Sequence, residues 1–310
     1  MPAVEIHEVT KTFGSHTAVD DLSLEVPEGT IYGFIGPNGS GKTTTLRMIM
    51  RIFHPDRGRI RVLDQDATDT GAADDAVAYL PEERGLYRQM KVRDVLRFYA
   101  RIKGMTDPDP EIDRWLGRMG LEAWADKKVQ ALSKGMSQKV QFIATVITRP
   151  KLVLLDEPFS GLDPVNGEVL REAVLSLRQE GTTVIFSTHD MSVAEKMCDA
   201  IFMIYKGKKV LNGTLEQIQD SYGEDTVRVR LAGESASSLN GLPGVNRVSD
   251  FGRYQELQLD RGTDSQAVLA ALMERGEVRH FELSRPSLLD IFVRIAGADS
   301  YENQPEDSHA

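Results

Sequence analysis

Cysteine is almost absent from this chain: Cys198 is the single one among 310 residues. A disulfide within the chain is therefore excluded, which is typical of proteins in a reducing compartment, most simply the cytoplasm. Cys198 lies in the run KMCDAIF, where we expect it to be a small buried apolar side chain.

Long apolar runs are absent as well. The longest are LVLL at residues 152–155 and AIFMIY at residues 200–205, whereas a helix needs about 20 apolar residues to span a bilayer. The first residues, MPAVEIHEV, carry acids early and do not resemble a signal peptide. We therefore expect a chain that does not cross a membrane by itself.

The chain also lacks an excess of positive charge, because 37 lysines and arginines stand against 47 acids, for a formal net charge of -10. This balance argues against binding to duplex nucleic acid or to an anionic membrane surface, and it leaves room for a small basic pocket for phosphate. The hydrophobic share of 41% is ample for a core, and the length suggests one large domain or two smaller ones.

Short strand-like runs alternate with longer helix-like runs in the first part of the chain. Apolar strands separated by helices predict an α/β fold with a mainly parallel sheet that is covered on both faces. The helices after residue 92 follow one another with no strand between them, which indicates an inserted helical subdomain at about residues 84–148. The expected strands are residues 4–9, 30–35, 76–80, 151–156, 182–187 and 200–205, and the expected helices lie near residues 42–53, 92–104, 109–118, 137–148, 165–180 and 190–198.

The pattern changes near Gly223. Three runs then alternate apolar and polar residues with a period of two, and two amphipathic helices are expected at residues 264–276 and 285–297. The chain therefore divides into a first domain, a small α+β domain and an acidic tail that we expect to be disordered. Their bounds are residues 1–222, 223–297 and 298–310.

A phosphate-binding loop is predicted where the strand at residues 30–35 runs into GPNGSGKTTT, with the spacing G-x-x-x-x-G-K-[ST]. Glycines let the backbone N–H groups approach phosphate oxygens, and the helix after Gly41 points its positive end at the same place. Lys42 can reach the β- and γ-phosphates, and the Thr43 hydroxyl can ligate Mg²⁺. A chance strand-to-helix turn is the alternative, and the motif alone leaves GTPases, kinases and ATPases open. The residues assigned to this loop are Gly36, Pro37, Asn38, Gly39, Ser40, Gly41, Lys42, Thr43 and Thr44.

Two adjacent acids, Asp156 and Glu157, end the apolar strand LVLLD. Acids at the end of a buried strand are costly unless the site uses them, and ligands of open α/β sheets bind at the carboxyl ends of the strands. We expect Asp156 to hold Mg²⁺ and Glu157 to act as the general base toward the attacking water. The alternative is that both acids begin a solvated loop.

Two further strands end at the same expected edge. His189 follows TTVIFS, where it is placed to hydrogen-bond a γ-phosphate and the attacking water, or to cap the next helix. Glu82 follows AVAYL in the run PEERGLY, and by itself this run is best explained as a charged turn.

Together these residues resemble the ATP-binding subunit of ABC transporters, over about residues 3–220 and in the order of that family. GPNGSGKT matches the Walker A motif, LVLLDEP matches Walker B with its catalytic Glu157, and SGLDP, with Asp163, matches the D-loop. PEERGLY stands in the Q-loop place, LSKGM at residues 132–136 stands in the signature place, and His189 matches the switch histidine. Phe13 in KTFG matches the aromatic that stacks on adenine, although without the resemblance a buried core residue is the better explanation.

The resemblance implies a P-loop NTPase core of the ABC ATPase type that binds ATP and Mg²⁺ and hydrolyses ATP. It implies a homodimer or heterodimer in head-to-tail arrangement, with each ATP between the Walker A motif of one chain and Ser133 and Gly135 of the other. Closure of this dimer would drive separate integral-membrane permease subunits through a groove beside the Q-loop. The chain would then be cytoplasmic and peripheral on the inner face of the membrane. The helix VRDVLRFYARIKG borders that groove, and its apolar stripe is equally explained by core packing.

Two departures from the family pattern are informative. Glu82 replaces the usual glutamine of the Q-loop; its carboxylate can still contact a metal but changes the local charge. The signature has Lys134 and Met136 where LSGGQ has glycine and glutamine, and Met136 offers no amide. These features and the phrase PSLLDIF at residues 286–292 are similar to the single-domain bacterial subunits of the sodium-exporting and drug-exporting types, which also carry a C-terminal domain.

Two other classes remain to be distinguished. A soluble ABC ATPase that acts on ribosomes or nucleic acid is disfavoured by the single nucleotide-binding core and by the lack of a basic patch. A regulatory module that binds nucleotide without turnover is disfavoured by Glu157 and His189. The best prediction is therefore an ATPase that supplies energy to a transporter, with no nucleic acid as partner.

Overall fold

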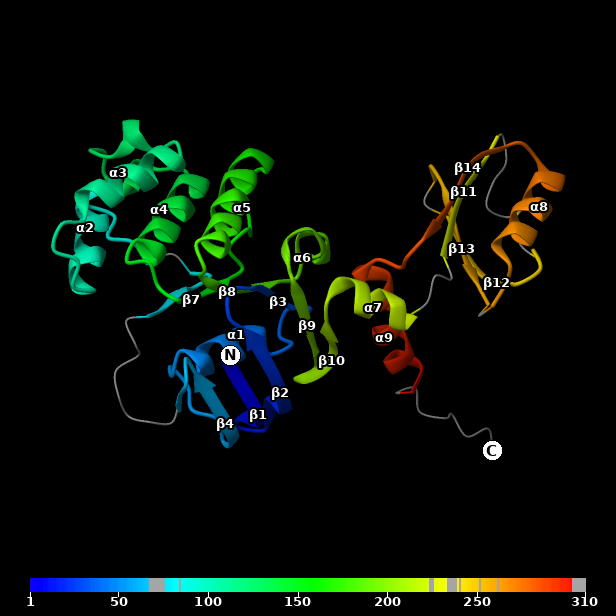
Figure 1. Cartoon of the computed structure of the whole chain (residues 1–310), viewed down its shortest axis with the longest axis horizontal. Helices are drawn as coiled ribbons and strands as arrows, with labels where there is room; N and C mark the ends of the chain where they lie inside the picture. The colour runs from blue at the N-terminus through cyan, green and yellow to red at the C-terminus, as the bar shows by residue number, and fades with distance from the viewer. Residues whose placement is uncertain are drawn as a thin grey trace. The chain divides into compact units, whose positions relative to one another are not determined.

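The computed structural model forms two units, Met1–Thr214 and Leu215–Ala310, which are called the first and second unit below (Figure 1). The sequence pattern placed the boundary between the domains near Gly223, whereas the second unit begins at Leu215. The difference is helix α7 (Leu215–Tyr222), which the sequence pattern did not single out. Side chains are described through Gly297. The structure describes residues 1–66, 76–83, 85–222, 226–232, 239, 241–250, 252–260 and 262–302.

A six-stranded sheet forms the centre of the first unit, in the order β10-β9-β3-β8-β7-β6. Every pair of neighbours in it is parallel except β9 and β10. All residues of β3 and β7 are buried, as expected for strands with both faces covered. The mainly parallel sheet is therefore confirmed. Its strands are β3 (Ile31–Ile35), β6 (Val77–Leu80), β7 (Leu152–Asp156), β8 (Thr183–Thr188), β9 (Ala200–Tyr205) and β10 (Lys208–Gly213).

A second, antiparallel sheet has the order β2-β1-β4-β5. Residues 4–9 form a strand as predicted, but we expected that strand in the parallel sheet; β1 instead pairs antiparallel with β2 and β4. Buried residues of both sheets and of α1 share one core, including Val4, Phe34 and Leu46. The sequence missed β2 and β4 because they mix charged with apolar residues, as strands with one buried face do. The strands are β1 (Pro2–Phe13), β2 (His16–Pro27), β4 (Arg57–Val62) and β5 (Gln65–Asp66).

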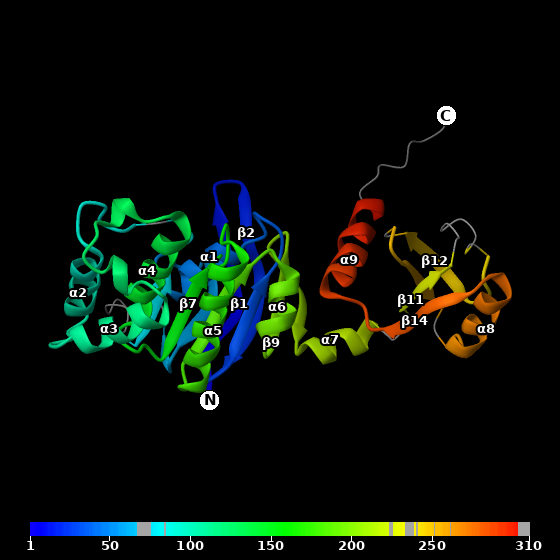
Figure 2. The same cartoon turned by 90° about the horizontal axis from the view of Figure 1, so that it is seen from above.

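Helices α2, α3 and α4 follow one another in the chain and lie together at one end of the first unit in both views (Figures 1 and 2). The apolar stripe of α2 is core packing, because Val92, Val95 and Leu96 are fully buried. Helix α4 begins at Lys134, three residues before the expected start at residue 137. The helices of the first unit are α1 (Lys42–Ile49), α2 (Val92–Ile102), α3 (Asp109–Arg118), α4 (Lys134–Val146), α5 (Pro164–Gln179) and α6 (Met191–Met197), with short 3₁₀ turns η1 (Glu122–Trp124) and η2 (Val129–Ala131).

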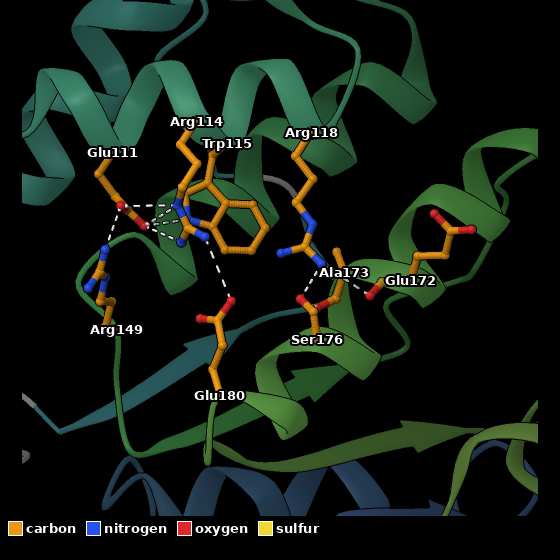
Figure 3. Close-up of polar contacts among 9 residues, drawn as sticks. All are labelled: Glu111, Arg114, Trp115, Arg118, Arg149, Glu172, Ala173, Ser176 and Glu180. Atoms are coloured by element: carbon orange, nitrogen blue, oxygen red, sulfur yellow. Dashed lines mark hydrogen bonds and ion pairs between the residues drawn. The ribbon is translucent and has the colours of Figure 1, made fainter.

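A network of charged residues fixes α3 against its neighbours (Figure 3). The buried Glu111 carboxylate accepts hydrogen bonds from Arg114 Nε at 3.2 Å, from Trp115 Nε1 at 3.0 Å and from Arg149 Nη2 at 3.0 Å. Burial opposes ionisation of Glu111, but the arginine hydrogen bonds outweigh it, so the pKa lies below its ordinary value. Arg118 donates to the Ser176 hydroxyl on α5. The network therefore joins α3 to α5 and to the turn before β7.

The second unit is a small α+β domain. Its sheet has the order β12-β13-β11-β14 with antiparallel neighbours, and it packs with α8 around Val229, Leu257 and Leu272. Strand β12 was not predicted; α9 runs to Glu302, into the tail that we expected to be disordered, and residues 303–310 lie outside the described residues. The elements are α7, β11 (Thr226–Leu231), β12 (Val245–Asp250), β13 (Gln255–Leu259), α8 (Ser265–Arg275), β14 (Val278–Ser284) and α9 (Leu288–Glu302).

In the part of the chain that the structure describes, no helix combines the length and the apolar character that a bilayer span requires.

Candidate active site

The carboxyl ends of four neighbouring parallel strands, β3, β8, β7 and β6, meet at one edge of the central sheet. The glycine-rich loop follows β3, Asp156 ends β7, and Thr188 ends β8. Parallel pairing therefore brings three separate sequence motifs to the same place, which is where ligands of open α/β sheets bind.

A cavity of about 370 Å³ opens at this edge. It includes three of the residues predicted from separate motifs, Phe13, Glu82 and Glu157. Two further lining residues, His16 and Ala18, come from β2, and no sequence signal pointed to them. The lining residues are Phe13, His16, Ala18, Asn38, Gly39, Ser40, Gly41, Lys42, Thr43, Thr44, Glu82 and Glu157.

Glycine is required at two positions of the loop. Gly36 has φ 149°, and a Cβ there would lie 2.2 Å from the backbone oxygen of Ile204. Gly41 has φ 110°, and a Cβ there would lie 2.5 Å from the backbone oxygen of Ala18. Any side chain at either position would collide with backbone, so the loop can close over the start of α1 only with glycine.

Lys42, the first residue of α1, lies almost fully buried beneath this loop. Its Nζ donates to the backbone oxygens of Gly36 at 2.7 Å and Pro37 at 3.1 Å, and it lies 3.7 Å from Oε1 of Glu157. Burial lowers the pKa of Lys42, while the nearby Glu157 and Asp156 carboxylates work in the opposite direction. The lysine thus places a cation beside the loop, with acids close enough to favour its charged form.

Asp156 is completely buried and is held by three hydroxyl groups. Its Oδ1 accepts from Ser187 Oγ at 2.6 Å and from Thr43 Oγ1 at 3.0 Å, and its Oδ2 accepts from Tyr79 OH at 3.1 Å. Burial, and then the Asp156 charge, raise the pKa of Tyr79 to about 12, so this phenol stays a donor. No sequence motif pointed to Ser187 or Tyr79; their positions on the neighbouring strands β8 and β6 are the signal that could have found them.

Glu157 adopts a strained backbone conformation, with φ 49°. Such left-handed values are uncommon outside glycine and collect at functional sites. The backbone N–H of Glu157 donates to Ser187 Oγ at 2.9 Å, and its Oε2 lies 3.0 Å from His189 Nδ1. Its Oε1 is buried and accepts no hydrogen bond from the described residues, although Lys42 lies nearby. This carboxylate is therefore fixed at one oxygen and open at the other.

His189 lies directly after β8 and faces Glu157 with a half-exposed side chain. His189 does not cap the next helix, which was the alternative role expected for it. Asp190 caps α6 instead, by accepting from the N–H groups of Ser192 at 2.9 Å and Val193 at 3.3 Å. The structure thus leaves His189 with a contact to the acid and access to solvent.

The predicted signature residues lie apart from this cavity. Ser133 is the N-cap of α4, where its hydroxyl accepts from the N–H of Met136 at 3.2 Å. Met136 packs against the apolar core. Asp163 caps α5 by accepting from the N–H of Asn166 at 3.0 Å, and a Cβ on Gly135 would lie 3.2 Å from the Asn166 side chain. Ser133 and Asp163 therefore lie at the starts of α4 and α5, outside the cavity, and Gly135 lies buried against the Asn166 side chain.

The cavity fits a nucleotide with its metal. Ser40 Oγ and Glu157 Oε1 are buried and have no hydrogen-bond partner among the described residues. Both atoms can therefore bind a ligand. The described residues contain no group of three His, Cys, Asp or Glu side chains placed to hold a metal. Thr43 and Asp156 supply two hard oxygen atoms, which suits Mg²⁺, an ion that takes its remaining ligands from water and phosphate.

Comparison with known families gives matches over both units. The family model described as "ABC transporter" matches residues 19–160, and the model described as "ATP-binding protein DrrA1-3-like, C-terminal domain" matches residues 213–296. A model described as "AAA domain, putative AbiEii toxin, Type IV TA system" matches residues 126–195, within the first unit. A solved structure titled "Structure of ATP binding subunit of ABC transporter" superposes with a TM-score of 0.67 at 28% identity, over 71% of this chain and 93% of that one.

Relatives of the whole chain belong to the same group. The chain is 42% identical to the "Uncharacterized ABC transporter ATP-binding protein YhaQ" of Bacillus subtilis, over 94% of this chain and 98% of the relative. It is 31% identical to the "Daunorubicin resistance ATP-binding protein DrrA3" of Streptomyces coeruleorubidus, over 96% of each. It is 32% identical to the "Nod factor export ATP-binding protein I" of Paraburkholderia xenovorans, over 96% and 98%. The chain therefore belongs to the ATP-binding proteins of ABC transporters.

Proposed function

We propose that this chain binds ATP with Mg²⁺ in the cavity at the sheet edge, hydrolyses it in a dimer, and thereby drives an exporter whose permease is a separate membrane protein. The energy-coupling role and the ATPase activity follow from the family. The observation that carries the assignment to this cavity is the meeting of the glycine loop, Lys42 and Glu157 around one space.

The phosphate loop binds the β- and γ-phosphates in this proposal. Residues 38–44 line the cavity and include the start of α1, whose positive end favours anions. Lys42 exchanges its carbonyl contacts for phosphate oxygens, and Ser40 gives its unpaired hydroxyl the partner that it lacks. Phe13 is 42% exposed, so its ring is available for an adenine to stack on.

The residues proposed to hold Mg²⁺ are Thr43 and Asp156, with Glu82 at the cavity wall. When bound, the ion would neutralise charge on the β- and γ-phosphates. The three hydroxyls around Asp156 keep its carboxylate in a fixed orientation, so little reorganisation is needed when the site fills.

Glu157 is the proposed general base. Water attacks the γ-phosphorus, the bond from that phosphorus to the bridging β–γ oxygen breaks, and the proton of the water passes to Glu157, which leaves ADP and inorganic phosphate. Oε1 is the oxygen free to take this proton, because Oε2 already faces His189 at 3.0 Å. His189 holds Glu157 in place and, as a half-exposed donor, can also contact the γ-phosphate.

A second copy is proposed to complete the site. Ser133, Gly135 and Asp163 do not line the cavity of their own chain, yet Ser133 is exposed at the start of α4, where an anion is favoured. Head-to-tail pairing places that surface against the γ-phosphate held by the facing chain. Lys134 adds a positive charge to it, and Met136, which is partly buried against the core, offers no amide for a polar contact.

Export is the proposed direction of transport, supported by the printed names of two relatives, one of a drug-resistance and one of a Nod factor export protein. The permease would hold this chain on the inner face of the membrane. The alternative is a soluble ATPase that acts on ribosomes or nucleic acid.

Co-purification separates these two functions. Tagged chain carrying Glu157→Gln is isolated from detergent-solubilised cells with ATP present, because a stalled complex keeps its partner. We expect a stoichiometric integral-membrane protein, whereas ribosomal proteins or nucleic acid in its place would refute the transporter function. The variant Lys42→Ala, treated in the same way, is the control for nucleotide-dependent capture.

A further inference from the structure

Gln141 is a buried polar residue to which no motif assigns a role. It lies on α4, the helix that begins with the signature residues, and only 7% of its surface is exposed. Its Nε2 donates a hydrogen bond of 3.2 Å to the backbone oxygen of Glu83, in the loop after β6. Its Oε1 is buried and accepts no hydrogen bond in the described part of the chain.

The unpaired oxygen makes this glutamine a poor choice for packing alone. A buried acceptor that has left water without gaining a partner costs free energy, and a leucine of similar size would avoid that cost. The surroundings are mostly apolar, since Gln141 lines a cavity of about 450 Å³ with Leu86, Tyr99 and Ala144 among others. The hydrogen bond to the loop is therefore the feature that distinguishes Gln141 from an apolar residue at this position.

That hydrogen bond holds the peptide next to Glu82. Glu82 lines the nucleotide cavity, and its charge acts on Lys42 in the direction that favours the lysine's charged form. Among the described residues, Tyr99 OH also donates a hydrogen bond to the backbone oxygen of Gly85 in this loop, but this contact is longer, at 3.4 Å, and exposed. The contact from Gln141 is shorter, is part-buried, and is made to the residue next to Glu82 in the chain.

We propose that Gln141 is a positioning residue for Glu82: its amide group holds the Glu83 carbonyl and so keeps the Glu82 carboxylate at the metal side of the nucleotide cavity. The inference rests on the proposed function, because it assumes that Glu82 contacts Mg²⁺ there. It also gives α4 a direct connection to the neighbouring site: one helix carries Ser133 and Gly135 at its start and Gln141 two turns later.

Equilibrium measurements of nucleotide binding test the positioning role of Gln141 without any ATP hydrolysis. The full chain is titrated with a fluorescent non-hydrolysable ATP analogue, with and without MgCl₂, and the ratio of the two affinities measures the contribution of the metal. In Gln141→Leu we expect this ratio to fall by about 2- to 10-fold, the range for loss of one hydrogen bond. Metal-free affinity and the melting temperature should not fall. Thr145→Val is the matched control, because Thr145 lines the same cavity and, among the described residues, its hydroxyl bonds the backbone oxygen of Gln141 within α4.

A double-mutant cycle with Glu82→Ala tests the route of the effect. If Gln141 acts through Glu82, Gln141→Leu has no further effect on the metal ratio once Glu82 is alanine. The proposal is overturned if Gln141→Leu changes the metal ratio equally in both backgrounds, or changes it in neither. It is also overturned if Thr145→Val changes the metal ratio by the same factor. Lower stability of both Gln141→Leu and Gln141→Met would also overturn it, because the amide would then be structural.

The same experiment separates this inference from the proposed function. If Mg²⁺ does not change nucleotide affinity in the unmodified chain, the proposed metal site itself is wrong. If Mg²⁺ does act but Glu82→Ala leaves the ratio unchanged, ATP and metal binding stand, and the positioning role of Gln141 is refuted.

Discussion

Replacing Glu157 by glutamine separates nucleotide binding from hydrolysis. The change keeps the size of the side chain and leaves the backbone hydrogen bond from Glu157 to Ser187 Oγ in place. The φ of 49° is no harder for glutamine than for glutamate, since both carry the same Cβ. The fold should therefore persist while the proton acceptor is lost.

The expected loss follows from the role of a general base. Such a group contributes about 10²- to 10⁴-fold to a reaction rate. Turnover should fall by this factor, which corresponds to about 3 to 5 kcal/mol of activation free energy. ATP affinity should stay the same or rise, because Lys42 keeps its position and one negative charge near the phosphates is removed.

Two assays check this prediction. Phosphate release at saturating ATP gives the turnover, and size-exclusion chromatography with light scattering gives the mass, which should double from 34.5 kDa when ATP is added but not when ADP is added. Glu28→Gln, the same charge change at an exposed residue away from the cavity, is the control. Turnover near that of the unmodified chain would refute the assignment of Glu157 as the base.

Three further changes test the nucleotide cavity. Lys42→Ala should weaken ATP binding by about 10- to 150-fold, the range for a charge-assisted hydrogen bond, and unchanged affinity by titration calorimetry would count against the phosphate loop. Gly36→Ala should destabilise the first unit by about 1 to 3 kcal/mol or more, because its Cβ meets the Ile204 backbone oxygen. Gly39→Ala, at φ 78°, carries backbone strain but meets no atom within 4 Å, so its melting temperature should fall less, and equal melting temperatures would contradict the collision. Phe13→Ala should weaken ATP binding by about 1 to 3 kcal/mol through lost stacking, whereas Phe13→Trp should keep the affinity of the unmodified chain. Unchanged ATP affinity in Phe13→Ala would show that Phe13 does not stack on the adenine.

The motifs with local geometry were predictable from the sequence. The phosphate loop needs glycines, a lysine and a following helix within ten residues, so its spacing alone indicates its shape. The parallel strands followed from their continuous apolar character, and with them the meeting of Asp156, Glu157 and His189 at one edge.

What the sequence did not reveal depends on contacts between distant segments. The hydroxyls of Ser187 and Tyr79 reach Asp156 only because β8 and β6 flank β7 in the sheet. Phe13 by itself suggested a core residue, and its exposure follows from its position at the end of β1. Gln141 looked like any polar helix residue, because the loop oxygen that it binds lies 58 residues earlier in the chain.

In the proposed mechanism each nucleotide site is shared between two chains, which mixing two inactive variants tests. Lys42→Ala removes the phosphate-loop half of the site, and Gly135→Asp places a negative charge in the signature half, so each variant alone should be inactive. In isolated heterodimers of the two, one composite site keeps both halves intact. ATP hydrolysis should return in these heterodimers, and heterodimers as inactive as the parent variants would show that the site is not shared in this way.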